Sequence, residues 1–165
     1  MSKVVKFIEK IASKIPGYGG YMNRENSRET DKALREYIAK KFLSLKSVID
    51  DKKEDALEDI GLEFLSDLDR LSSILDRLHN QILYAARGYA GVFDRIKVYE
   101  DELETLYAFD AEFLSHYEEL EKTMQSLFSQ GGENAKQELR AARKALEALE
   151  KKWQERGDLF ESFAK

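Results

Sequence analysis

Residues 57–82 read "LEDIGLEFLSDLDRLSSILDRLHNQI" and give the clearest indication of the fold class. Its apolar side chains recur at steps of three or four residues, the spacing of one face of an α-helix. One double step of four, from Ile60 through Phe64 to Leu68, is a stutter, which locally unwinds a supercoil. A three-four seam this long indicates helices that pack along their length. The apolar positions are Leu57, Ile60, Phe64, Leu68, Leu71, Leu75, Leu78 and Ile82.

The same spacing extends through most of the chain. On the N-terminal side the seam positions are Leu34, Ile38, Phe42, Leu45 and Ile49. The next run consists of Val92, Ile96, Tyr99, Leu103, Leu106, Asp110, Phe113, Tyr117, Leu120, Met124 and Leu127. The last run consists of Ala135, Leu139, Ala142, Leu146, Leu149, Trp153, Arg156, Phe160 and Phe163. Four helical runs of this kind predict a bundle.

Three interruptions divide the seam. "DDKKED", residues 50–55, predicts a short break with an aspartate as the next helix cap, and "SQGGEN", residues 129–134, predicts a loop. At "AARGYAGVF", residues 85–93, either the chain turns at Gly88–Gly91, or one helix of about 110 Å runs from Glu54 to Ser129 at 1.5 Å per residue. We favour the turn, because it gives four helices of similar length that bury their own seams.

The predicted fold is all-α: an antiparallel, coiled-coil-like four-helix bundle preceded by a short N-terminal amphipathic helix. Two units are expected, residues 1–21 for the amphipathic helix and its Pro/Gly joint, and residues 22–165 for the bundle. The long helices are expected near residues 26–50, 54–87, 91–129 and 133–163.

Composition excludes several classes of function. The 165 residues include no cysteine, which rules out disulfides, a thiolate nucleophile and a thiolate metal site. The formal charge of -5 argues against a general nucleic-acid binder, which needs a basic face to displace counterions. We expect a cytoplasmic protein, peripheral at a membrane if its first segment docks there.

The first segment, "SKVVKFIEKIASKI" at residues 2–15, is a basic amphipathic helix. Residues 1–24 carry about +4 by side-chain counting, which leaves about -9 for the remainder. Either the helix covers one end of the protein's own core, or it docks to a partner or to the anionic face of a membrane, where binding by one short helix would be weak. The docking candidates are Lys3, Lys6, Phe7, Lys10, Ile11 and Lys14.

"PGYGGY", residues 16–21, predicts a joint between this helix and the bundle. Pro16 cannot continue a helix, and Gly17, Gly19 and Gly20 allow the chain to turn. A phosphate-binding loop would need a preceding strand and a Lys-Ser/Thr pair after the glycines, and this segment has neither.

Three short stretches, "IPGYGGYMNRE", "GYAGVFD" and "LYAFD", carry a resemblance. The chain resembles a group of uncharacterised prokaryotic all-helical proteins that open with I-P-G-Y-x-G-Y and carry G-Y-x-G-x-F-D in mid-chain. The likeness extends from Ile15 to Asp110. It implies that the joint and the mid-chain glycines belong together, and it implies no activity.

No catalytic residue, metal site or cofactor is predicted. A di-iron bundle needs two Glu-x-x-His motifs, in which a glutamate lies three residues before each histidine. Here the residue three before His116 is Phe113, and the residue three before His79 is Asp76. The serines lack the Gly-x-Ser-x-Gly turn of hydrolases. His79 is better explained as a residue at the boundary of the core.

Asp110 and Arg156 are the charged exceptions in the seam. A buried carboxylate must be paired or protonated, and the two helices place Asp110 within about one turn of Arg156. We predict a buried pair that fixes the alignment of the helices, with Arg70 or Tyr107 as other possible neighbours of Asp110. The functional alternative is a polar pocket inside the bundle.

A second polar stretch, "NRENSRETDKALRE", covers residues 23–36. Its pairs Arg28–Asp31, Asp31–Arg35 and Lys32–Glu36 have helix-neighbour spacing. We interpret them as modest ion pairs on a solvated face, with a docking surface for a partner as the alternative.

These observations favour a non-enzymatic interaction or scaffold protein with a protein partner or self-association. The N-terminal helix would dock to that partner or to a membrane face. The alternative is a ligand- or metal-binding bundle, or an enzyme, with a polar pocket around Asp110.

Overall fold

The computed structural model describes residues 3–20, 24–59, 61–85, 100–129, 134–163 and 165. Every regular element within these ranges is helical, so the predicted all-α fold class is confirmed. The elements are α1 (Lys3–Ala12), α2 (Arg24–Asp59), the short 3-10 helix η1 (Leu62–Phe64), α3 (Leu65–Tyr84), α5 (Glu100–Ser129) and α6 (Ala135–Phe163).

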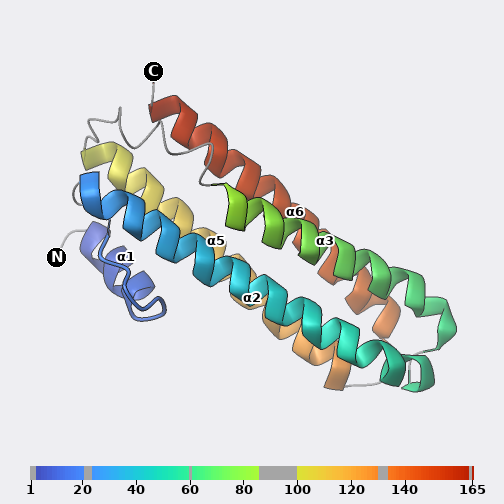
Figure 1. The fold of residues 1–165 in the computed structure, drawn as a ribbon. Coiled ribbons are helices and arrows are strands. Elements are labelled where there is room, and N and C mark those ends of the chain that lie inside the picture. The colour runs from blue at the N-terminus through green and yellow to red at the C-terminus, as the bar shows by residue number, and fades with distance from the viewer. Residues whose placement is uncertain (1–2, 21–23, 60, 86–99, 130–133, 164) are drawn as a thin grey trace.

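The long helices form two antiparallel hairpins that pack side by side (Figure 1). α2 pairs with α3, α5 pairs with α6, and α3 also contacts α6, while the short α1 lies against α5. The chain reverses direction between Tyr84 and Glu100, because α3 ends and α5 begins at the same end of the bundle (Figure 1). The alternative of one continuous helix from Glu54 to Ser129 is therefore wrong. Gly88–Gly91, where the turn was predicted, lies outside the described residues.

The chain breaks between α2 and α3 at a different place from the predicted one. "DDKKED" lies inside α2, which continues to Asp59. Asp50 there accepts a hydrogen bond from Lys46 and pairs with Lys53, so its charge supports the helix instead of capping a new one. The turn comes at Gly61, whose φ of 100° lies in the region that favours glycine, followed by η1.

The stutter in the seam coincides with this turn. Phe64 is the last residue of η1, and α3 begins at Leu65. The predicted boundary between the first two long helices is therefore wrong. The prediction that they have similar lengths is also wrong, since α2 has 36 residues and α3 has 20. By contrast, the predicted ends of the two later helices, at residues 129 and 163, agree with the ends of α5 and α6.

The predicted seam forms the core of the bundle. From Leu68 to Ile82 every predicted seam position is buried, and so is every one from Leu106 to Leu127 and from Ala135 to Phe160. Aromatic rings connect three helices. The ring centroids of Phe42 in α2 and Tyr117 in α5 are 5.0 Å apart, and those of Phe113 in α5 and Trp153 in α6 are 5.5 Å apart. Such edge-to-face pairs add to the stabilisation that burial provides.

Candidate functional site

Asp110 of α5 and Arg156 of α6 form a buried ion pair. Arg156 donates from Nε to Asp110 Oδ1 at 2.8 Å and from Nη2 to Oδ2 at 3.3 Å. The two side chains are 1% and 0% exposed. The structure thus brings together the two polar seam residues that the sequence singled out. Arg70 is not the partner of Asp110, since it lines a surface cleft between α3 and α6.

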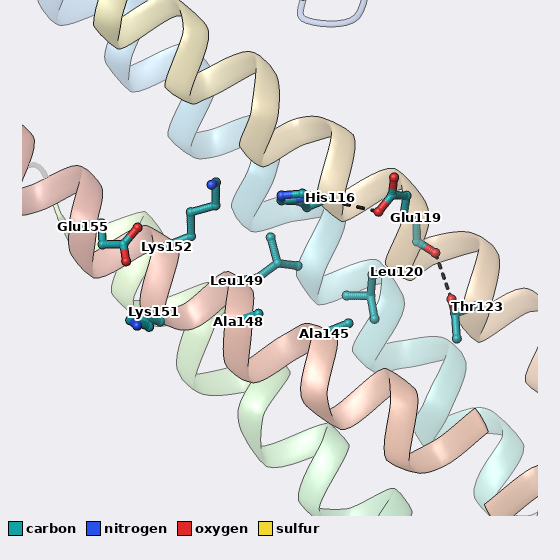
Figure 2. A pocket seen from close by; sticks show the side chains of 10 residues that line it. All are labelled: His116, Glu119, Leu120, Thr123, Ala145, Ala148, Leu149, Lys151, Lys152 and Glu155. Carbon is teal, nitrogen blue, oxygen red and sulfur yellow. Dashed lines mark hydrogen bonds and ion pairs between the residues drawn. The ribbon is translucent and has the colours of Figure 1, made fainter. Parts of the chain in front are cut away.

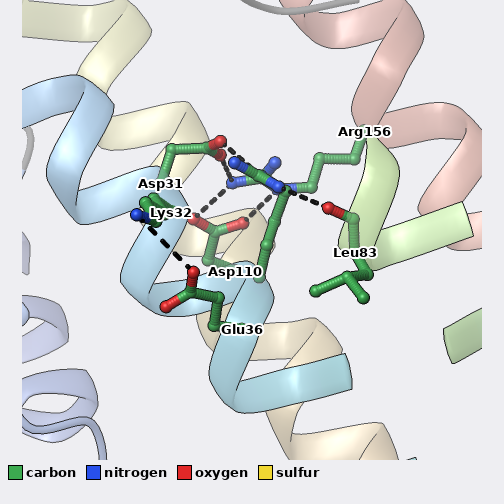
Figure 3. A network of polar contacts seen from close by, with 7 residues as sticks. Asp31, Lys32, Glu36, Leu83, Asp110 and Arg156 are labelled. Carbon is green, nitrogen blue, oxygen red and sulfur yellow. Dashed lines mark hydrogen bonds and ion pairs between the residues drawn. The ribbon is translucent and has the colours of Figure 1, made fainter. Parts of the chain in front are cut away.

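The pair belongs to a larger network that reaches α2 and α3 (Figure 3). Arg156 Nη2 lies 3.0 Å from Asp31 Oδ1, and Arg35 Nε donates to Asp31 Oδ2 at 2.7 Å. Arg35 Nη1 also donates to the backbone oxygen of Leu83 at 3.0 Å. That oxygen is in the last turn of α3, where carbonyl groups have no partner within the helix. We call Asp31, Arg35, Asp110 and Arg156 the buried charge network.

The buried charge network is balanced and enclosed. Two carboxylates face two guanidinium groups, so the charges cancel within a region from which water is excluded. The guanidinium of Arg156 also lies over the rings of Trp153 and Phe160, at 5.0 and 4.8 Å from their centroids. These contacts suit a structural role that joins four helices more than they suit a group that must reach a substrate.

The α2 half of this network was not predicted from the sequence. Asp31 and Arg35 were interpreted as part of a solvated face, but they are 2% and 5% exposed in their side chains. The interpretation is correct for Lys32 and Glu36, which are exposed and 3.8 Å apart. The spacing of the seam could have shown this, because Asp31 lies three residues before Leu34 and so continues the seam by one step towards the N-terminus.

The joint lies close to this end of the bundle. Thr30, next to Asp31, donates its hydroxyl to the backbone oxygen of Gly20 at 2.9 Å. Gly17 and Gly20 both have φ of 82°, and a Cβ on Gly20 would lie 2.8 Å from Tyr107 Oη. Pro16, Gly17 and Gly19 are exposed, whereas Tyr18 is buried. The glycine at position 20 therefore permits a close approach of the joint to α5.

α1 lies with its apolar side against the bundle. Ile11 is buried and Phe7 is half-buried against the same core as the long helices. Lys14, beyond the end of α1, pairs with Glu118 of α5, whereas Lys6 and Lys10 are exposed. The side chain of Lys3 lies outside the described residues. α1 ends at Ala12, before Pro16, and in the described part of the chain no helix is long and apolar enough to cross a bilayer.

A groove opens to solvent between α5 and α6 (Figure 2). Its volume is about 480 Å³. Leu120 and Leu149 lie at its floor and are buried beneath it, whereas Ala145 and Ala148 leave room above them because their side chains are short. We call it the α5–α6 groove. No pattern in the sequence predicted it, because Ala148 lies outside the seam.

Charged side chains flank this groove. Lys152 of α6 lies 2.8 Å from Glu112 of α5, and this contact holds the pKa of Glu112 below its usual range. His116 lies 3.5 Å from Glu112 and 3.8 Å from Glu119. Lys151 is exposed on the α6 side. The α5 edge is thus mainly acidic, and on the α6 edge Lys151 and Lys152 outnumber Glu155.

The two histidines make separate contacts. His79 is half-buried with Nδ1 2.8 Å from the backbone oxygen of Ala39, which places it at the boundary of the core. His116 is on the exposed face of α5. Within the ranges described, no three His, Cys, Asp or Glu side chains are grouped so that they could hold a metal ion.

Comparison with known proteins gives no relative. No protein-family model matches the chain, and neither a curated protein nor a solved structure matches it. The geometry of the described residues is therefore the basis for any functional proposal.

Proposed function

We propose that this protein is a non-enzymatic interaction protein, and that the α5–α6 groove binds an amphipathic helix of a partner protein. The observation that carries the proposal is an apolar groove between two long helices, where Ala145 and Ala148 border the opening and the buried Leu120 and Leu149 lie beneath it. Amphipathic helices commonly bind in apolar grooves through side chains at positions i, i+3, i+4 and i+7.

The edges of the groove support a preferred orientation of the bound helix. A partner helix would place basic side chains along α5, near Glu119, and acidic side chains along α6, near Lys151. Complementary charges at the rim of an interface contribute more to orientation and association rate than to affinity. The two alanines leave space for larger apolar side chains of the partner.

Two other roles have less support. For a ligand pocket or an active site around Asp110, the difficulty is that its carboxylate already accepts two hydrogen bonds from Arg156 and is almost fully buried. For docking through α1, the difficulty is that Ile11 and Phe7 lie against the core, which leaves mainly Lys6 and Lys10 for contact with a partner or an anionic membrane surface. A weak electrostatic contact of this kind is compatible with a cytoplasmic protein.

Site-specific photo-crosslinking tests the groove. A photoreactive residue replaces Lys151 in the full chain, in cells that naturally produce the protein. We expect one discrete adduct, with the cross-link in a predicted amphipathic helix of the other protein. Ala148→Trp, which fills the groove, should abolish the adduct, whereas Ser47→Trp on the exposed face of α2 should leave it unchanged.

Three outcomes would contradict the proposal. One is the absence of any adduct, and another is an adduct that persists in Ala148→Trp. The third is an adduct of two copies of this chain, which would assign the groove to self-association. Far-UV circular dichroism of both tryptophan variants shows whether the helices are intact.

A further inference from the structure

A second cleft lies between α3 and α6 and differs in chemistry from the α5–α6 groove. Its volume is about 720 Å³. We call it the α3–α6 cleft. It is lined by Leu62, Leu65, Ser66, Asp69, Arg70, Ser73, Ile74, Arg77, Arg143 and Glu147. Three guanidinium groups and two hydroxyl groups thus surround an opening that also has apolar walls.

The three arginines are not equally engaged. Arg77 is fully paired, because Nε and Nη2 contact the two carboxylate oxygens of Glu150 at 2.5 and 2.9 Å. Arg143 lies 3.8 Å from Glu147, and its Nε is shielded from solvent and makes no hydrogen bond. Arg70 is exposed, and no acidic side chain pairs with it among the residues that the structure describes. Arg70 and the terminal nitrogens of Arg143, whose side chain is 36% exposed although its Nε is shielded, therefore have donors to offer to a ligand.

The charges of the cleft leave Arg70 uncompensated. Asp69, one of the two acidic residues of the lining, lies 2.9 Å from Lys53 of α2, which is outside the cleft. Glu147, the second acidic residue of the lining, pairs with Arg143. Arg77 is neutralised by Glu150, and this contact holds the pKa of that carboxyl below its usual range. The cleft therefore has one unbalanced positive charge.

The start of α3 borders the cleft but adds little to its positive character. Leu65 and Ser66 are the first two residues of α3, and both line the cleft. The N-cap position, Phe64, provides no side-chain hydrogen bond. Helix N-termini favour anions because their first N–H groups have no partner within the helix, but here η1 precedes α3 directly and the N–H of Leu65 already donates to the backbone oxygen of Leu62. The arginines therefore carry the positive character of the cleft.

Apolar side chains form the rest of the lining. Ile74 is buried at the base, Leu65 is half-buried, and Leu62 at the edge is 74% exposed. Such an exposed leucine next to a cationic cleft provides a surface for the apolar part of a ligand.

From these contacts we infer that the α3–α6 cleft binds a small compound with a phosphate group and an apolar moiety. Arg70 and Arg143 bind the phosphate, and Leu62, Leu65 and Ile74 contact the apolar moiety. A guanidinium group donates two parallel hydrogen bonds to phosphate oxygens, and a phosphate has enough oxygens to accept from two arginines at once. This site is independent of the α5–α6 groove.

The test measures binding of three probes to the full chain by NMR titration or calorimetry. Phenyl phosphate has both the charge and the apolar group, inorganic phosphate lacks the ring, and benzoate replaces the phosphate by a carboxylate. We expect saturable binding of phenyl phosphate, weaker binding of inorganic phosphate, and the weakest binding of benzoate. Equal affinities for phenyl phosphate and benzoate would overturn the assignment of a phosphate ligand.

Variants locate the site. Arg70→Ala and Arg143→Ala should each weaken binding of phenyl phosphate about tenfold or more, since a hydrogen-bonded charge contributes about 1.5–3 kcal/mol and 1.4 kcal/mol is a factor of ten. Arg140→Ala is the matched control, because Arg140 is an exposed residue of α6 that does not line the cleft. Equal weakening by Arg140→Ala would reduce the effect to general electrostatics and overturn the proposal. Leu62→Ser should weaken phenyl phosphate but not inorganic phosphate.

Discussion

Two groups of four charged side chains connect α2 to other helices, and each group has two carboxylates and two cations, but their surroundings are opposite. The buried charge network has two aspartates and two arginines near the start of α2. A second group, nearer the end of α2, has two aspartates and two lysines on the surface. We call it the exposed charge cluster, and it consists of Lys46, Asp50, Lys53 and Asp69.

The contact distances of the two groups are similar. In the exposed charge cluster Lys46 Nζ lies 2.8 Å from Asp50, and Lys53 Nζ lies 3.0 Å from Asp50 and 2.9 Å from Asp69. In the buried charge network the closest contacts are 2.7 to 3.0 Å. Exposure is what differs: the side chains of the exposed charge cluster are 25% to 58% accessible, and those of the buried network at most 5%.

This difference in exposure should determine how much each group contributes to the stability of the fold. Water screens an exposed pair, so its net contribution is about 0–1 kcal/mol. A buried pair must first be stripped of water, so the complete pair is worth little, but the loss of one partner leaves a dehydrated charge. The buried network also uses arginine, whose planar fork holds two carboxylates in fixed positions.

Arg156→Met should have the largest effect on stability. The change leaves Asp31 and Asp110 as buried carboxylates without their shared cation. We expect the free energy of unfolding to fall by about 3–5 kcal/mol, as is typical when one partner of a buried pair is removed. Urea denaturation followed by circular dichroism measures the change. Arg140→Met, on the exposed face of α6, should change stability by less than about 0.5 kcal/mol.

A loss of less than about 1 kcal/mol in Arg156→Met would mean that water reaches the carboxylates. The comparison between the two groups of charges would then fail, because both would be solvated.

A double-mutant cycle on Asp110 and Arg156 should give the next largest effect. In Arg156→Ala the carboxylate of Asp110 stays buried without its cation, and in Asp110→Ala the guanidinium keeps only Asp31. The double variant should therefore be more stable than the sum of the two single changes predicts, by about 1–3 kcal/mol. Strictly additive changes in the free energy of unfolding would argue against the contact. The same cycle on Lys53 and Asp69 should give a coupling below about 1 kcal/mol.

The two groups also differ in how far the sequence could predict them. Asp110 and Arg156 stood out because each interrupts an otherwise apolar seam, and a buried charge needs a partner. Asp31 and Arg35 lie within a run of polar residues, so their burial depends on the position of α3 and α6 around them. Spacing within one helix does not provide that information.

The chain break between α2 and α3 gives a related lesson. The charged run "DDKKED" has the composition of a loop, yet its ion pairs are compatible with a helix. Gly61 and the stutter around Phe64 were the stronger signals, and both were interpreted as part of a continuous helix. The α5–α6 groove and the α3–α6 cleft could not be predicted, because each is formed by side chains of two helices whose relative rotation the seam does not define.

Gly20→Ala tests the close contact of the joint with α5, near the buried charge network, and should have an intermediate effect on stability. Its φ of 82° is unfavourable for alanine, and the new Cβ would lie 2.8 Å from Tyr107 Oη. We expect the free energy of unfolding to fall by about 1–3 kcal/mol, the range for a strained backbone conformation. Gly19→Ala is the matched control, because its φ is not positive and a Cβ added there would have no neighbouring atom within 4 Å. Equal effects of the two changes would show that the joint does not require glycine at position 20.

Asp50→Asn should have the smallest effect, and its pH dependence gives the sharpest test of the comparison. Hydrogen bonds from Lys46, Lys53 and Ser72 hold the pKa of Asp50 well below its ordinary value of 3.8, although partial burial opposes them. A carboxyl with a lowered pKa in the folded state contributes stability above its unfolded pKa, and this contribution is lost as the pH falls below that value. At pH 7 we therefore expect Asp50→Asn to lose about 0–1 kcal/mol of stability, and less in high salt.

As the pH falls from about 4 towards 2, the difference in stability between Asp50→Asn and the unmodified protein should shrink. Urea denaturation at each pH measures it, with Asp158→Asn on the exposed face of α6 as the control. A difference that stays constant from pH 7 to pH 2 would mean that the charge of Asp50 does not contribute, and that only the shape of its side chain does.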